Sequence, residues 1–132
     1  MLFRSGAVSL RSVLIPVAVE PWPQIAVKAV ANLAAAMKLP KVEFHLLHVG
    51  EPGDMPAVEM PQRASWEWHR ISRRGAVVDT VIDVAEDYRA DLIVMTTDGH
   101  HDIFDGLRGN STERVLHRAK CPLLAVPVLK TA

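Results

Sequence analysis

The chain has 132 residues, of which 49% are hydrophobic and 23% are charged, and its 15 basic and 15 acidic side chains leave no formal net charge. This composition is typical of one globular domain, residues 1–132, and excludes a disordered chain. Without a basic surplus, we expect no nucleic-acid partner, and no apolar run reaches the ~18 residues of a membrane helix. Because the single cysteine, Cys121, cannot form a disulfide within the chain, we expect a cytoplasmic protein.

The first half of the chain predicts two strands, one helix and a long loop. Residues 1–11 precede the first apolar run and are interpreted as an N-terminal extension. A continuous apolar run over residues 13–18 is typical of a strand buried on both faces, and residues 42–49 predict a second strand. Apolar residues at helical spacing between them predict a helix that ends near Lys38. Residues 51–64 are rich in proline and lack periodicity, so we expect a long loop there.

Residues 65–71 predict a strand near an edge of the sheet. Their side chains alternate, so that Trp66 and Trp68 share one face while Glu67 and His69 share the other. A face that carries a glutamate and a histidine suits a half-exposed strand. In a chain without a basic surplus, the tryptophans indicate packing against a helix or a partner rather than stacking on bases.

The second half of the chain predicts two helices and two further strands. Residues 78–85 carry a clear helical stripe, and residues 92–95 form a buried apolar run. A polar loop over residues 96–109 leads into a short helix. The last strand is expected over residues 123–128, where Pro127 restricts it to an edge or a strand end. Strands that alternate with helices predict an α/β fold with mostly parallel pairing and helices on both faces.

In an open parallel sheet, ligands bind outside the carboxyl ends of the strands. Three segments should meet there: residues 18–21, the end of the second strand at Val49, and the loop over residues 96–109. That loop enters a helix for which Asn110 would be the N-cap and Glu113 would complete a capping box. Backbone N–H groups and the helix dipole make such an N-terminus an anion site.

Much of the chain, from about residue 12 to residue 128, resembles the universal stress protein family. The resemblance is most specific in the C-terminal third, over residues 91–95, 111–116 and 121–126, and residues 13–17 and 46–49 also fit. It implies a single-domain, open, five-stranded sheet with strand order 3-2-1-4-5, similar to that of adenine-nucleotide alpha hydrolases. It further implies a stress-response module that binds ATP or a related adenine nucleotide, with magnesium as the accompanying ion.

Members of this family that bind ATP share a pattern of a glycine, two residues, a glycine, nine residues, a glycine and then serine or threonine. This chain keeps the spacing, but Thr96 replaces the first glycine and Asn110 replaces the hydroxyl residue. Ala18 stands where the family has an aspartate at the end of the first strand. Ala18 therefore removes a hydrogen-bond acceptor, and Thr96 adds a branched side chain where glycine allows close approach.

The resemblance also implies which residues surround the nucleotide. Val49 and Met95 would lie near the adenine and ribose, and Gly99, Gly109, Asn110 and Ser111 would surround the phosphates. The complete set of predicted cofactor-binding positions is Pro16, Val17, Ala18, Val49, Met95, Thr96, Gly99, Gly109, Asn110, Ser111 and Thr112.

Two other functions stay open. The changes at Ala18 and Thr96 favour a nucleotide-free interaction module of the same fold. A metal-dependent enzyme could be built on His100, His101 and Asp102, although these residues lack a standard zinc spacing. We expect no catalytic residues and at most slow, incidental ATP hydrolysis, because no positioned base or metal-binding carboxylate motif is visible.

The last strand and three isolated side chains complete the sequence-based predictions. Relatives in the family commonly form homodimers, and the apolar strand Leu123 to Val128 suits edge-to-edge pairing. His45 and His48 are an odd number of residues apart, so they should point to opposite faces of one strand. Cys121 has no base nearby in the sequence and is expected to be buried rather than catalytic.

Overall fold

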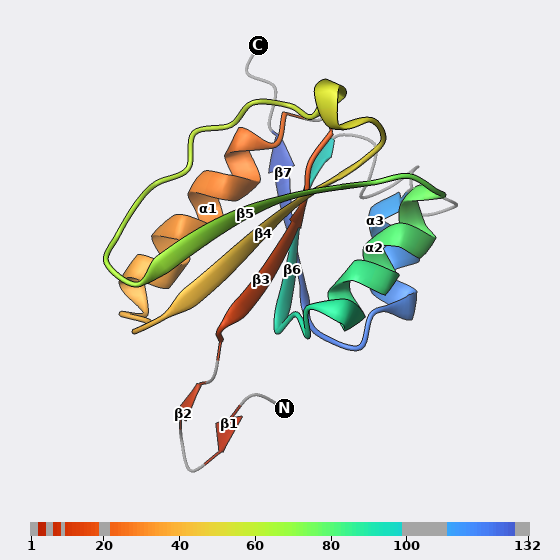
Figure 1. Cartoon of the computed structure of the whole chain (residues 1–132). Helices are drawn as coiled ribbons and strands as arrows, with labels where there is room; N and C mark the ends of the chain where they lie inside the picture. The colour runs from red at the N-terminus through yellow and green to blue at the C-terminus, as the bar shows by residue number, and fades with distance from the viewer. Residues whose placement is uncertain (1–2, 5–6, 9, 19–21, 99–110, 129–132) are drawn as a thin grey trace.

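The computed structural model describes residues 3–4, 7–8, 10–18, 22–98 and 111–128. Near the N-terminus, β1 (Phe3–Arg4) and β2 (Ala7–Val8) pair as a two-stranded antiparallel sheet. This small sheet lies apart from the main body of the chain (Figure 1). Among the described residues, no helix combines the length and the apolar character needed to cross a membrane.

The main sheet has five strands in the order β5-β4-β3-β6-β7, and every neighbouring pair is parallel. The strands are β3 (Ser12–Pro16), β4 (Val42–Val49), β5 (Trp66–Arg73), β6 (Leu92–Asp98) and β7 (Leu123–Val128). Numbered within this sheet, the order is 3-2-1-4-5, as the family resemblance implied. β3 is central, whereas β5 and β7 are the edge strands, which confirms the edge position predicted for residues 65–71.

Helices cover both faces of the sheet (Figure 1). α1 (Gln24–Ala36) packs on one face, and α2 (Val77–Asp87) and α3 (Ser111–Arg118) pack on the other. Alternate residues of a strand point to opposite faces. Ile15 of β3 therefore packs in the α1 cluster, while Leu14 packs in the α2 and α3 cluster. Both side chains are fully buried, so the centre of the sheet is the core.

The segment over residues 51–64 forms one short 3-10 turn (Pro52–Asp54) and otherwise runs without regular structure. The prediction of a long loop is confirmed. Gln24 at the start of α1 binds it through both ends of its amide: Nε2 donates to the carbonyl of Glu59 at 2.9 Å, and Oε1 accepts from the N–H of Glu59 at 2.7 Å. Val58 is buried against the α1 cluster, so the loop covers part of the core beside α1 (Figure 1).

The side chains of the edge strand β5 alternate between two faces, and both tryptophans lie on the same face, as predicted. Trp66 is 7% exposed and meets the ring of Phe44 edge-on, with 5.2 Å between centroids. Trp68 stacks on the same Phe44 ring, with 4.1 Å between the ring centroids. The indole N–H of Trp68 donates to the carbonyl of Pro61 at 2.8 Å. The tryptophans thus pack the edge strand against β4 and the long loop, which agrees with the packing interpretation.

Candidate functional site

The carboxyl ends of β3, β4 and β6 meet at one edge of the sheet. Pro16 pairs with Leu47, and the N–H of Val17 donates to the carbonyl of Leu47 at 2.8 Å. On the other side, Leu14 pairs with Ile93, and continuing this register brings Val17 level with Thr96. The topology therefore brings together predicted positions that lie far apart in the sequence.

The predicted positions at this edge differ in burial. Val17, Met95 and Thr96 are buried, with exposed fractions of 4%, 7% and 9%. Ala18 is exposed, Met95 belongs to the α2 and α3 cluster, and Val49 packs against that cluster. The structure thus places the positions predicted near the adenine and ribose in one cluster. Half-buried positions at this edge and at the start of α3 are Pro16, Val49, Ser111 and Thr112.

Thr96 carries a buried hydroxyl at this edge. Its Oγ1 atom is buried and has no hydrogen-bond partner within the described part of the chain. A buried polar atom without a partner costs free energy, so such atoms call for an explanation. Gly99, Gly109 and Asn110, together with His100, His101 and Asp102, lie outside the described residues.

The helix α3 begins at a predicted phosphate-binding position. Ser111 is its first residue, and Glu113 lies in the first turn. The first N–H groups of a helix have no partner within the helix and, with the dipole, favour a negative ligand. Asn110, the N-cap of the predicted capping box, lies outside the described residues.

Four titratable side chains that the sequence analysis did not combine gather on the α2 side of β4 and β5. The register pairs Glu43 with Glu67 and His45 with His69. The Nε2 atom of His69 lies 3.4 Å from Oε1 of Glu43 and 3.5 Å from Oε1 of Glu67. The ring of His45 stacks on that of His69, with 5.2 Å between centroids. The shared face of Glu67 and His69 was the signal available in the sequence, but their pairing with β4 was not.

His45 and His48 point to opposite faces, as predicted. The two residues between them show this directly, because Leu46 packs in the α1 cluster and Leu47 in the α2 and α3 cluster. Burial lowers the pKa of His45, the neighbouring His69 lowers it further, and Glu43 raises it. His45 is therefore held in its neutral form.

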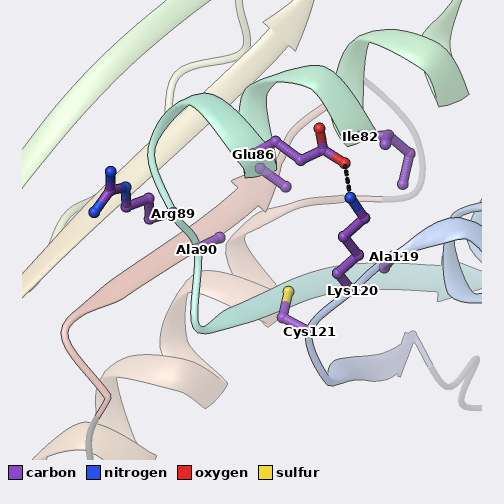
Figure 2. A pocket seen from close by; sticks show the side chains of 8 residues that line it. Ile82, Glu86, Arg89, Ala90, Ala119, Lys120 and Cys121 are labelled. Carbon is purple, nitrogen blue, oxygen red and sulfur yellow. Dashed lines mark ion pairs between the residues drawn. The ribbon is translucent and has the colours of Figure 1, made fainter.

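A pocket of about 310 Å³ lies between the end of α2 and the start of β7. Figure 2 shows Cys121 beside it, with Lys120 and Glu86 forming an ion pair of 3.4 Å across it. Cys121 is half-buried rather than fully buried as predicted. Burial raises the pKa of the Cys121 thiol, and the nearby Asp91 raises it further. The thiolate is disfavoured, so this pocket lacks an activated nucleophile.

A sequence model of the universal stress protein family matches residues 67–127. Universal stress protein A homolog 1 of Coxiella burnetii is 46% identical over 58 residues, which cover 44% of this chain and 38% of that protein. Residues 67–127 of the chain are therefore similar to the universal stress protein family. The chain spans only 36% to 44% of the length of the curated universal stress proteins that it matches.

Solved universal stress protein structures share the fold. One in complex with cAMP superposes with a TM-score of 0.66 at 19% identity, covering 89% of this chain and 97% of that one. Another, from Arabidopsis thaliana with AMP bound, gives a TM-score of 0.60 at 15% identity, covering 89% of this chain and 90% of that one. At these identities the likeness concerns the fold.

The family match covers the β6 and α3 parts of the predicted nucleotide site, but not the β3 and β4 parts. The matched residues 67–127 include Met95 and Thr96 of β6 and Ser111 and Thr112 of α3. The positions on β3 and β4, which include Ala18 and Val49, lie outside it. The departure at Ala18 therefore falls outside the matched stretch, whereas Thr96 lies within it.

Proposed function

We propose that this chain is a universal stress protein and that it binds an adenine nucleotide at the carboxyl edge of its sheet, between the ends of β3, β4 and β6 and the start of α3. The observation that carries the proposal is that the end of β3 lies between those of β4 and β6, with Val49 and Met95 on the face that α2 and α3 cover. Relatives of the same fold bound to cAMP and AMP support it.

The polarity of this edge suits a nucleotide. Val49 and Met95 offer an apolar surface for a base, and the first turn of α3 offers N–H donors and two hydroxyl side chains for a phosphate. The buried Thr96 hydroxyl adds a polar atom that lacks a partner within the described residues. We propose ATP with magnesium as the nucleotide, and we propose binding rather than catalysis as the activity, in the cytoplasm.

The test is calorimetric titration of AMP, cAMP and ATP with magnesium into the wild type and a Gly109→Glu variant. A carboxylate placed next to the phosphates repels them, so we expect saturable binding by the wild type and a loss of at least about tenfold in the variant, equivalent to about 1.4 kcal/mol. Ala36→Glu is the matched control, because Ala36 is an exposed residue at the end of α1, away from the carboxyl edge (Figure 1).

Two outcomes would overturn the nucleotide proposal. One is the absence of saturable binding of all three nucleotides at millimolar concentration, and the other is equal binding by the two variants. Either result would favour the nucleotide-free interaction module. That second function is favoured by Ala18, which stands where the family has an aspartate, and by Trp22, a large apolar side chain that is 58% exposed just before α1.

A further inference from the structure

The cluster of Glu43, Glu67, His69 and His45 lies toward the amino ends of β4 and β5, away from the carboxyl edge. Its two carboxylates and the His69 ring are 42% to 56% exposed, so solvent ions reach them. The proposed nucleotide site and this cluster therefore occupy opposite ends of the sheet. A test of one does not depend on the outcome for the other.

The distances within the cluster match those between ligands of one metal ion. Zinc lies about 2.0–2.2 Å from carboxylate oxygen and imidazole nitrogen, so two ligands at a tetrahedral angle are about 3.3–3.6 Å apart. His69 Nε2 lies 3.4 Å and 3.5 Å from the two glutamate oxygens. All three donor atoms lie within 4.8 Å of one another.

The hydrogen bonding of the two histidines is incomplete. His69 Nε2 is buried at the atomic level and makes no hydrogen bond to any described residue, although it sits between two carboxylates. His45 is only 3% exposed, and its Nδ1 likewise has no partner among the described residues. Its ring lies against His69 and also contacts Tyr88 at the end of α2, 4.6 Å between centroids. Two imidazole nitrogens at this cluster thus lack hydrogen-bond partners among the described residues.

We propose that Glu43, Glu67 and His69 bind a divalent transition-metal ion such as zinc, with the buried His45 ring packed against His69. Imidazole with carboxylate suits zinc, cobalt or manganese, whereas magnesium and calcium prefer oxygen alone. The exposure of the three side chains leaves room for water to complete the coordination. The ion would join edge strand β5 to its neighbour β4 through side chains on both strands.

The experiment uses the full chain without a tag, freed of metal by a chelator. Zinc is titrated by calorimetry, and cobalt by visible absorption, which reports the ligand geometry directly. We expect one equivalent of zinc to bind the wild type and to raise its melting temperature. His69→Gln and Glu43→Gln should each weaken binding at least about tenfold, as changes around metal sites typically do by 10–100-fold.

Two controls separate this cluster from other histidines. His117→Gln removes a histidine that also faces a glutamate, Glu113, at 3.8 Å on α3, and should leave zinc binding unchanged. A His100→Gln, His101→Gln double variant tests the histidine pair in the loop and should also bind as the wild type does. Circular dichroism of each variant in chelator shows that it is folded, and magnesium serves as the non-binding cation.

Three results would overturn the metal site. The first is no saturable zinc binding by the wild type at submillimolar concentration, in which case His69 and the glutamates form only an ion pair. The second is unchanged binding by folded His69→Gln. The third is loss of zinc binding in the His100→Gln, His101→Gln double variant while His69→Gln binds zinc as the wild type does. That result would assign the metal to His100 and His101.

Discussion

Cys121 shows how partial burial sets the chemistry of one side chain. Its thiol borders the pocket in Figure 2, and burial and Asp91 both raise its pKa. Because the thiolate is the form that reacts, a raised pKa lowers the reactive fraction near neutral pH. We expect iodoacetamide to modify native Cys121 several-fold more slowly at pH 7.5 than the same residue in urea. The native rate should rise only at a higher pH than the unfolded rate does, which mass spectrometry over a pH series measures.

The unfolded chain is the matched control, because Cys121 is the only cysteine in the sequence and reacts in both states. Equal pH midpoints for the native and unfolded proteins would contradict the prediction. A native rate that exceeds the unfolded rate would reveal an activated thiol and reopen the question of a reactive site at this pocket.

At the scale of elements, Gln24 is the side chain that fixes the loop over residues 51–64 to α1. It is 9% exposed, and its two hydrogen bonds to the backbone of Glu59 close a contact between residues 35 positions apart. Gln24→Ala leaves both backbone groups of Glu59 without these bonds. At 0.5–1.5 kcal/mol for each bond, we expect a loss of about 1–3 kcal/mol in the free energy of unfolding, measured in urea.

The same variant should increase amide hydrogen exchange in residues 55–61 more than in the central strands, because the loop loses its attachment while the sheet keeps its own. Gln62→Ala is the control, since Gln62 is an exposed glutamine of the same loop. If the two variants lose equal stability, Gln24 does not hold the loop.

These elements also show what the sequence could predict. The strands, the helices and the edge position of β5 follow from apolar periodicity and from the topology implied by the family resemblance. The attachment of the loop to α1 through Gln24 could not be predicted, because the bonded residues Gln24 and Glu59 lie 35 positions apart in the sequence. The cluster around His69 depends on the register of β4 against β5, and a slip by one residue would turn Glu43 to the opposite face.

At the scale of the whole molecule, the sheet has two edges, and β7 is the edge for which pairing with a second copy was predicted. An edge strand presents unpaired N–H and C=O groups, and a lysine there discourages pairing with another chain. Ala125 is an exposed residue in the middle of β7. We expect the wild type to sediment as a dimer at tens of micromolar and Ala125→Lys to sediment as a monomer with unchanged circular dichroism.

Ala36→Lys is the matched control, because Ala36 is an exposed alanine at the end of α1, away from either edge strand. It should remain dimeric, so that loss of the dimer in Ala125→Lys reports the strand and not the added charge. A dimer that survives Ala125→Lys would place the interface elsewhere, with β5 as the other edge to test. A wild type that stays monomeric at the highest concentration would contradict pairing altogether. The edge of β7 would then stay unpaired, with Pro127 already removing one of its N–H donors.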